Sequence, residues 1–578
     1  MCYNWVLRTW SVAGMGKLSR AAIAVIALAL ILVGVLRVRS TYSVFSSTYD
    51  EPEHIAQGME WLSRGTYNYD PKHTPLGPVT AALPLWLSGS RSVGLADPWD
   101  EGSAILATNG GYRENLAKAR APMIVFFIVM CGVVFAWSTE LYGPWIGLLC
   151  LLELSLTPGI LAHSGLAASD MAGASTFVLA LWVLSRWIRQ RTGGRAILAG
   201  LCVALAMGAK LSAAPFLVAC AAVWLAIQCW SCRGWPSQAL RFRPGHILLI
   251  GLSAFLLIWA AYRFHSEPLS AARAVRTYQA GLDQRTVPGR LAKKALDVPI
   301  PGGNIIRGLG DLLLTEHGPP IPQYFLGEVK KGGWYLYFPI AFLVKTPLPL
   351  LILVAGGALL ALRILLRRGD IEGCYPVGFA AVLFLICLPT EWDIGTRYLL
   401  AVYPLFSIAS GLAIRTLWQS RRSTLASRVV TAGLLFWLAA ESVYAHPDYL
   451  SYFNELAGSR PEKILVECDL DWGQDLYRLQ QEAERVHASP LWEAYYGSSR
   501  PQAYGFDMRR WPDDDTVAGW VGVSMHNLVF SPERFAWLAP YSWRQVGKSI
   551  RLYFVPAPAP APTVAPNREQ ALTVLHLK

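Results

Sequence analysis

The feature that most constrains this chain is a series of long apolar segments separated by short polar connections. A helix needs about 20 apolar residues to cross a bilayer core of about 30 Å, and about eleven segments meet or approach that length. The first segment is followed directly by Arg37 and Arg39 without a cleavage site, so we predict that this span is retained. The predicted spans are residues 21–36, 122–137, 144–162, 171–187, 196–209, 211–228, 247–264, 337–362, 376–389, 398–414 and 429–444.

The composition agrees with a membrane protein and argues against two other classes. Of the 578 residues, 53% are hydrophobic and only 16% are charged, whereas a soluble domain has about 25% charged residues. Lys and Arg (51) exceed Asp and Glu (39) by 12, but the basic residues form short clusters between apolar segments instead of a continuous basic face. We therefore exclude a soluble enzyme and expect no nucleic-acid partner.

The basic clusters predict the orientation in the membrane. Cytoplasmic loops are enriched in Lys and Arg, and a cytoplasmic N-terminus puts every large cluster on that side. The clusters lie at residues 186–195, 233–243, 363–368 and 415–428. Two long loops and the C-terminal part then lie outside the cytoplasm, and we expect the protein in a bacterial inner membrane with its active site on the extracytoplasmic face.

This orientation predicts three parts of the chain. Residues 1–445 form a transmembrane domain with extracytoplasmic loops at 38–121 and 265–334. Residues 446–555 form a small extracytoplasmic α/β domain, because apolar runs at 464–466, 520–523 and 550–555 alternate with a helical stretch at 474–486. Residues 556–578 form a Pro/Ala-rich tail.

Two segments of the first loop have their own character. Glu51–Arg64 is predicted to be an amphipathic helix lying along the membrane surface. Leu76–Leu87 is apolar but short and interrupted by Pro78 and Pro84, so we expect it to lie at the interface or dip into the membrane without crossing it.

Adjacent carboxylates follow the first span. Asp50 and Glu51 lie next to the bilayer, where a carboxylate can meet a lipid headgroup and an acceptor from water and can serve as a general base for a hydroxyl or amine. Solvated loop charges are the alternative. Asp170 begins a later apolar helix, where a helix cap and a catalytic role are compatible.

Three cations lie at predicted outer helix ends. Arg397 can bind a phosphate in a bidentate manner, and Lys210 and Lys345 can complete a cationic collar for an anionic lipid. The alternatives are an interfacial anchor for the arginine and snorkelling lysines that keep their charge in water.

Other patterns carry less weight. Asp469-Leu-Asp471 has the D-x-D pattern of nucleotide-sugar transferases, but such donors are scarce outside the cytoplasm. Cys229 and Cys232 form a C-x-x-C without a second pair or a nearby histidine. Most other cysteines lie in apolar segments, so no disulfide set is predicted.

Several motifs together resemble a known family. They are Tyr49-Asp-Glu-Pro-Glu-His54, His73-Thr-Pro-Leu76, Pro158-Gly-Ile-Leu-Ala-His163 with Ser169-Asp170, Lys345-Thr-Pro-Leu-Pro, Gly395-Thr-Arg-Tyr398, His446-Pro-Asp-Tyr-Leu-Ser-Tyr-Phe-Asn454 and Asp469-Leu-Asp-Trp-Gly-Gln-Asp475. In this order they resemble the prokaryotic branch of the dolichyl-phosphate-mannose protein mannosyltransferase-like family, up to about residue 555. These enzymes are glycosyltransferases of the GT-C fold that use polyprenyl-phosphate sugars.

The resemblance implies roles for individual residues. The catalytic acidic motif of the first loop maps onto Asp50 and Glu51, and a second acid maps onto Asp170. His54 and His73 are supporting residues, although Thr74 stands where relatives usually have proline. Glu51, His54 and His73 can hold a divalent metal, but the reaction does not require one.

The expected protein is therefore an inverting glycosyltransferase that moves a mannose-like sugar from a polyprenyl-phosphate carrier to a glycan, lipid or protein acceptor. Asp50 takes the acceptor proton, and Arg397 with Lys210 or Lys345 offsets the charge of the departing phosphate. The alternative is a secondary transporter or flippase of an anionic lipid, suggested by Glu153 inside a span. A structural or receptor protein is a third possibility, which the clustered acids and bases disfavour.

Overall fold

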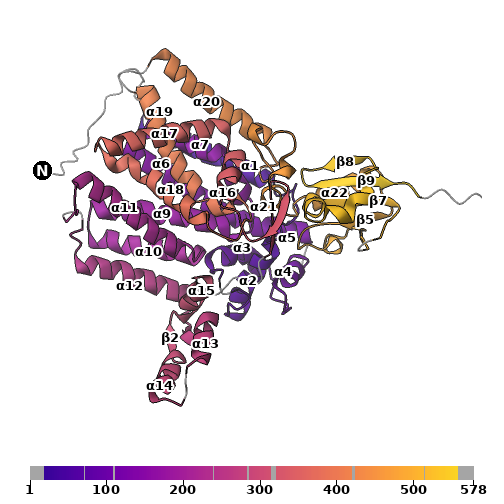
Figure 1. Ribbon diagram of the computed structural model, residues 1–578, viewed down its shortest axis with the longest axis horizontal. Coiled ribbons are helices and arrows are strands. Elements are labelled where there is room, and N and C mark those ends of the chain that lie inside the picture. The colour runs from indigo at the N-terminus through magenta and orange to yellow at the C-terminus, as the bar shows by residue number, and fades with distance from the viewer. Residues whose placement is uncertain are drawn as a thin grey trace, which may run out of the picture.

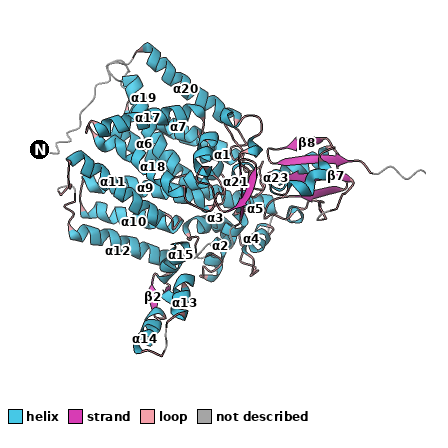
Figure 2. Ribbon diagram, in the orientation of Figure 1, coloured by secondary structure: helices cyan, strands magenta, loops and turns pink. Residues whose placement is uncertain are grey.

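The structure is a computed structural model that describes residues 19–70, 72–108, 111–237, 240–282, 285–313, 321–419, 424–512 and 515–557. The predictions for the basic residues Arg421 and Arg422 and for most of the Pro/Ala-rich tail lie outside these residues. Figure 1 shows a helical bundle with a small β-sheet domain at one end, and Figure 2 separates the two by secondary structure.

Each predicted span falls on one or two helices of the bundle. The bundle helices are α1 (Arg20–Ser40), α6 (Ile124–Tyr142), α7 (Pro144–Leu156), α8 (Pro158–Ser164), α9 (Ser169–Arg189), α10 (Gly193–Ala209), α11 (Ala213–Cys232), α12 (Pro244–Ala261), α16 (Tyr337–Lys345), α17 (Leu348–Leu366), α18 (Tyr375–Cys387), α19 (Val402–Gln419) and α20 (Leu425–Tyr444). Within the described residues, 7 helices are long and apolar enough to cross a membrane, or up to 8 if α7 and α8, bent by 65°, form one span. The helices α10 and α18 are shorter apolar helices.

Burial separates the centre of the bundle from its lipid-facing rim. In the most apolar 18-residue stretch of α9, 67% of the residues are buried. In the corresponding stretches of α1, α11 and α12, only 17% are buried. A helix that is apolar on all sides and exposed within the protein needs an apolar solvent. The rim of α1, α11 and α12 therefore faces lipid, and α9 carries its first residues into the interior.

The first long loop folds over one end of the bundle. Its helices are α2 (Glu51–Arg64), α3 (Leu76–Leu87), α4 (Pro98–Leu106) and α5 (Tyr112–Arg120). Both α2 and α3 have the bounds expected from the sequence. The prediction that α2 lies along the membrane surface differs from the structure, because residues 51–60 are all buried and α2 packs against α3 and α4.

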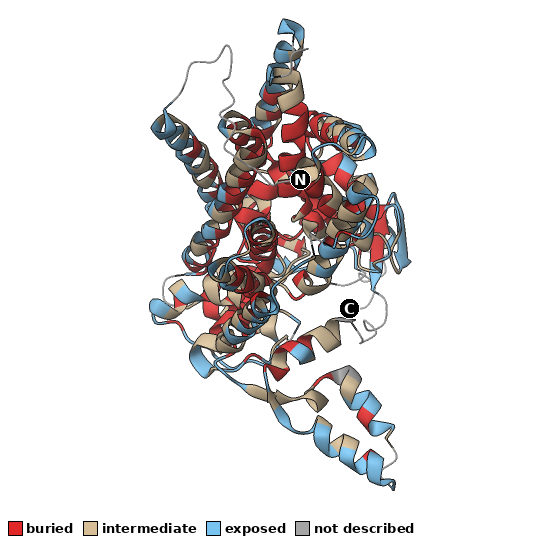
Figure 3. Ribbon diagram, turned by 90° about the vertical axis from the view of Figure 1, so that its left-hand side faces the viewer, coloured by how far each residue is buried: buried red, intermediate tan, exposed pale blue. Residues whose placement is uncertain are grey.

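The second long loop forms a projecting arm and a hairpin. It contains β1 (Ser266–Pro268), α13 (Arg273–Ala280), α14 (Val287–Leu296), β2 (Pro299–Pro301), α15 (Gly303–Leu313), β3 (Pro322–Phe325) and β4 (Glu328–Lys331). Strands β1 and β2 pair in antiparallel fashion, as do β3 and β4. Figures 1 and 3 show α13 and α14 extending away from the bundle.

The C-terminal part contains a mixed sheet of order β6-β5-β7-β9-β8. Its elements are α21 (Glu467–Leu470), α22 (Leu476–Arg485), β5 (Leu491–Ala494), β6 (Arg509–Arg510), β7 (Gly519–Ser524), α23 (Met525–Phe530), β8 (Trp543–Val546) and β9 (Ile550–Val555). Strand β5 is parallel to β6 and β7, and β9 is antiparallel to β7 and β8. The predicted helix at 474–486 and the apolar runs at 520–523 and 550–555 lie in α22, β7 and β9.

One apolar run of the C-terminal part does not join this sheet. Residues 464–466 are not in a strand, and Leu465 is fully buried in the main hydrophobic core of the bundle. The chain between α20 and α22 is therefore packed against the membrane-embedded part, next to the residues described below.

Candidate active site

Four of the predicted site residues form a continuous series of charges. Lys210 Nζ lies 2.6 Å from Asp170 Oδ1, and Arg397 Nη1 lies 3.8 Å from Asp170 Oδ2. The same Arg397 nitrogen donates a hydrogen bond to Asp50 Oδ2. Two cations thus alternate with two carboxylates that come from loops and helix ends far apart in the sequence.

The local structure explains why these residues meet. Asp170 is in the first turn of α9 and Lys210 caps the C-terminus of α10, so each charge lies at the helix end that favours its sign. Arg397 is in a 3-10 turn, Thr396–Leu399, that follows Gly395. Gly395 has φ of +100°, and a Cβ there would lie 3.0 Å from Cys468 Cβ, so the turn needs glycine.

A small cavity begins at these charges and continues between apolar helices. Asp170, Lys210 and Arg397 line its polar end. Phe177 of α9 and Phe216 of α11 line the rest, together with Leu400. The cavity therefore combines two cations with an apolar wall, which suits an anionic headgroup attached to a lipid chain.

Asp50 and Glu51, although adjacent, lie in different surroundings. Glu51 is fully buried, and both of its oxygens are engaged: Arg120 donates to each at 2.7 Å, Thr48 N donates at 2.8 Å and Ala167 N at 2.8 Å. Burial alone would raise the pKa of Glu51, but the Arg120 guanidinium and these hydrogen bonds outweigh it and hold the pKa below its ordinary value. Glu51 thus fastens α2 to α5 and to the segment before α9.

Lys345 does not line the cavity. Its ammonium group is buried and donates to the carbonyl oxygens of Leu450 at 2.7 Å and Asp469 at 2.5 Å. It also lies 4.3 Å from the centre of the Phe453 ring. These contacts tie the end of α16 to the chain between α20 and α22, so the structure brings Lys210 and Arg397 to the cavity but not Lys345.

The two acids of the D-x-D pattern point to different partners. Asp469 accepts hydrogen bonds from the backbone nitrogen of Thr396 at 3.1 Å and from its hydroxyl at 2.7 Å, and so supports the Arg397 turn. Asp471 accepts from the backbone nitrogens of His526 at 2.9 Å and Gly473 at 3.2 Å. Both carboxylates therefore hold backbone in place.

The C-terminal part contributes contacts that the sequence analysis did not identify. The Trp472 ring lies 4.9 Å from the Arg397 guanidinium carbon, within the range of a cation–π interaction. The chain before Asp50 pairs with residues 472–474: Tyr49 N donates to Trp472 O at 2.9 Å and Ser46 N to Gln474 O at 3.0 Å. The Asp50 backbone and the Arg397 side chain thus rest on the same segment.

An aromatic stack joins the start of α2 to the sheet domain. Tyr49 stacks on Tyr496 with ring centres 5.4 Å apart, and Tyr496 stacks on His526 at 3.6 Å. Ser498 Oγ donates to Tyr49 O at 2.6 Å. The residue that precedes Asp50 is therefore fixed by the C-terminal sheet domain as well as by the bundle.

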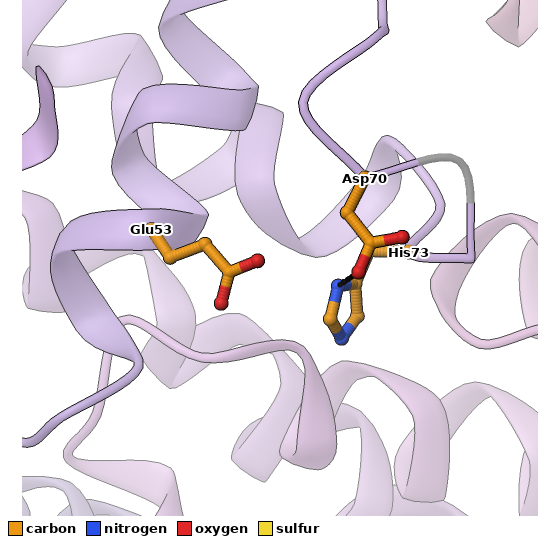
Figure 4. A group of neighbouring side chains, drawn as sticks. All are labelled: Glu53, Asp70 and His73. Atoms are coloured by element: carbon orange, nitrogen blue, oxygen red, sulfur yellow. Dashed lines mark ion pairs between the residues drawn. The ribbon is translucent and has the colours of Figure 1, made fainter. Parts of the chain in front are cut away.

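A second group of polar residues lies on α2 and the loop that follows it. Glu53, Asp70 and His73 each offer one ligand atom, and these atoms lie within 4.8 Å of one another (Figure 4). Two carboxylates and an imidazole suit a divalent transition metal. Among the described residues no other group of this kind occurs, and the free cysteines Cys229 and Cys232 do not form one.

Burial and the neighbouring carboxylates shift the pKa values of this group. Burial raises the pKa of Glu53 to about 7, and the carboxylates of Asp50 and Asp70 add to the effect. Burial disfavours charged His73, but the hydrogen bond and charge of Asp70, 3.2 Å away, outweigh it and raise the pKa of His73. His54, whose ring is 4.9 Å from that of His73, has its pKa lowered by burial to about 4.

Comparison with known proteins relates part of the chain to a described family. Residues 112–274 match the family model described as dolichyl-phosphate-mannose-protein mannosyltransferase. Within these residues the chain is similar to this family of membrane glycosyltransferases. The predicted resemblance is thereby confirmed over residues 112–274, and the long apolar helices are those of an integral membrane protein. The matched residues include Asp170 and Lys210 but not Asp50 or Arg397.

Solved structures with a similar course of the chain have low sequence identity. ArnT from Cupriavidus metallidurans bound to undecaprenyl phosphate is 12% identical, with a TM-score of 0.49 over 94% of this chain and 100% of that chain. The Archaeoglobus fulgidus oligosaccharyltransferase in the apo form is 14% identical, with a TM-score of 0.41 over 76% and 58%. A search of curated protein sequences found no match.

Proposed function

We propose that this glycosyltransferase moves a sugar from a polyprenyl-phosphate carrier to an acceptor on the extracytoplasmic face, with inversion at the sugar carbon. The observation that carries the proposal is the series Asp50, Arg397, Asp170 and Lys210 at the mouth of an apolar cavity. It combines a carboxylate able to accept a proton with cations able to hold a phosphate.

The donor phosphate binds between Arg397 and Lys210. A phosphate oxygen is a good acceptor for both side chains, and the polyprenyl chain continues along the cavity past the packed rings of Phe177 and Phe216. In the structure these two cations are neutralised by Asp50 and Asp170. Donor binding therefore draws Arg397 toward the phosphate and leaves Asp50 free to accept a hydrogen bond.

In the transfer step the acceptor hydroxyl attacks the sugar carbon and its proton passes to Asp50. The bond between that carbon and the phosphate oxygen breaks, and the bonding electrons leave with the polyprenyl phosphate. The negative charge that develops on the phosphate lies between Arg397 and Lys210, which are fixed before the reaction and lower its barrier. Asp170 keeps both cations oriented, and Glu51 keeps α2 in place.

The group Glu53, Asp70 and His73 fits a divalent cation, which would add positive charge to the site. Neighbouring contacts also connect α2 to the loop that follows it, because Gln57 Nε2 lies 3.4 Å from His73 Nδ1 and the His54 ring lies 4.9 Å from the His73 ring. Glu51 is not part of this group, since its oxygens are already engaged.

The alternative of a lipid transporter rested on Glu153 inside the predicted span 144–162, and the structure places this residue in the last turn of α7. Its side chain accepts a hydrogen bond from Ser410 of α19, and Thr157 of the next turn donates to its backbone oxygen. The acid therefore joins two helices of the bundle, as a buried polar contact between membrane helices does. This role needs no transport path.

The orientation of the site is tested by a reporter fused after Lys578 that is active only in the cytoplasm. We expect no reporter activity, because the basic clusters leave an odd number of spans before the C-terminal part. A second reporter is placed in the loop at 363–368. If the reporter after Lys578 were active and the one in this loop inactive, the assignment of the site to the extracytoplasmic face would be reversed.

The function is tested with purified protein, a panel of labelled polyprenyl-phosphate sugars and a membrane extract that supplies acceptors. We expect one donor to release polyprenyl phosphate and label one acceptor class, and the Asp50→Asn variant to do neither above background. Asp100→Asn, an exposed acid that is paired with Arg500, is the matched control. Transfer by Asp50→Asn at the parent rate would contradict the proposal.

A further inference from the structure

The arm formed by residues 273–298 lies outside the site and the sheet domain. It consists of α13 and α14 and is attached through the β1–β2 hairpin, while α15 packs against its base. Figure 1 shows the arm crosswise to α12, and Figures 1 and 3 show it projecting beyond the neighbouring helices. Most of its residues have no cover from the rest of the described chain.

The base of the arm lies at the same end of the bundle as the candidate active site. At the end of α12, Trp61 of α2 donates to Ala261 O at 2.9 Å. Ile305 of α15 belongs to the same buried cluster as Tyr67 and Leu211, the residue after Lys210. The arm therefore leaves the bundle where the membrane-spanning helices end and runs along that end.

The exposed surface of the arm carries large apolar side chains. Val287 is 59% exposed and Leu291 62% exposed, and their spacing of four residues puts them on one face of α14. Tyr278 of α13 is 66% exposed, and Val298 at the end of the arm is 53% exposed. Such a set of exposed side chains is unfavourable in water and favourable at a lipid surface.

The charges of the arm have one predominant sign. Residues 273–298 contain six basic and two acidic side chains. Lys293 and Lys294 are adjacent on α14, and Arg290 lies one turn before them. Basic side chains beside an apolar face are the pattern by which peripheral helices bind bilayers that contain anionic lipids.

We propose that the arm binds the surface of the bilayer that surrounds the protein, with Val287 and Leu291 among the acyl chains and its basic side chains on anionic phospholipid headgroups. Three features of the arm fit binding to the bilayer surface: its position at the end of the bundle, its exposed apolar side chains and its positive charge. The arm would hold the protein at a defined depth in the membrane beside its own active site.

The test uses the full chain reconstituted in nanodiscs of zwitterionic lipid, with or without anionic phosphatidylglycerol. A fluorophore is attached to Leu291→Cys, and in a separate sample to Val287→Cys, in a variant whose Cys2, Cys229 and Cys232 are serine. Brominated acyl chains quench a fluorophore that lies among them. The matched control is Ser542→Cys, an exposed position in the sheet domain.

We expect strong quenching at residues 291 and 287 and none at residue 542. In zwitterionic nanodiscs, or after Lys293→Glu with Lys294→Glu, quenching at residue 291 should fall severalfold, and high salt should have the same effect in anionic nanodiscs. Absence of quenching at both arm positions in the anionic nanodiscs would overturn the proposal. The proposal would also be overturned if residue 291 became shielded from a water-soluble quencher only after a membrane protein extract is added. That result would indicate a protein partner.

Discussion

Two groups of charged residues meet at the start of α2. We call Asp50, Arg397 and Asp170 the catalytic face, and the buried pair Glu51 and Arg120 the anchor. On the catalytic face, Asp50 is partly exposed and shares Arg397 with Asp170. In the anchor, Glu51 has no exposed surface and is saturated by Arg120 and backbone donors. A carboxylate can act as a base only if an oxygen is available to the acceptor, so we propose that Asp50 accepts the proton and that Glu51 positions α2.

The largest effect on the folded protein is expected from breaking the anchor. Glu51→Gln leaves Arg120 with an uncompensated buried charge, and such a change typically costs about 3–5 kcal/mol. The thermal unfolding midpoint of the detergent-solubilised protein should fall clearly. The double variant Glu51→Leu/Arg120→Met removes both charges and should lose less stability than the sum of the two single variants. Additive losses would mean that the pair is not an anchor.

On the catalytic face, the largest effect after that of Asp50 is expected from Arg397. Arg397→Lys keeps the charge but removes the bidentate geometry, and a hydrogen bond to a charged group is worth about 1.5–3 kcal/mol. Donor affinity should therefore fall about tenfold or more, while the unfolding midpoint changes little. Binding of a labelled polyprenyl phosphate measures this directly, and unchanged affinity would remove Arg397 from the donor site.

A smaller effect on donor binding than that of Arg397→Lys is expected from Trp472, the residue of the C-terminal part that contacts Arg397. A cation–π contact contributes about 0.5–2 kcal/mol, so Trp472→Leu should weaken donor binding severalfold, whereas Trp472→Phe should restore most of it. Arg397 would lose the aromatic surface that holds its guanidinium group. Equal donor affinity in the leucine variant and the parent would show that this stacking does not position Arg397.

A further effect on stability concerns Glu53 and depends on pH. Because the pKa of Glu53 is raised to about 7 in the folded protein, the folded state favours its protonated form, and this contribution is lost as the pH rises from about 4.5 through 7. In the presence of a chelator, Glu53→Gln should raise the unfolding midpoint at pH 8 and leave it nearly unchanged at pH 4.5. A uniform shift at both pH values would contradict the assignment.

The sequence predicted the helices well because their signal is local. Apolar segments of membrane length and the short polar breaks between them are visible residue by residue, and α2 and α3 begin and end at the expected residues. The motif order predicted the resemblance to the family, and the match over residues 112–274 confirms this resemblance for that part of the chain. These features do not depend on which segments meet in space.

The partners of individual side chains were not predictable in the same way. Glu51 and Arg120 are 69 residues apart, and Trp472 is farther still from the first loop. No spacing in the sequence relates them. Lys345 and Lys210 looked alike as cations near helix ends, but Lys345 is enclosed by carbonyl oxygens while Lys210 lines the cavity. Only tertiary packing separates these roles.

The most direct measurement is a single turnover of bound donor in two variants, Asp50→Asn and Glu51→Gln, corrected for the fraction of folded protein. We expect Asp50→Asn to bind donor at least as tightly as the parent, because Arg397 loses a competing carboxylate, and to transfer sugar about 10²–10⁴ times more slowly. Folded Glu51→Gln should retain most of the parent rate. Transfer by Asp50→Asn at the parent rate, with folded Glu51→Gln inactive, would contradict the assignment and make Glu51 the base.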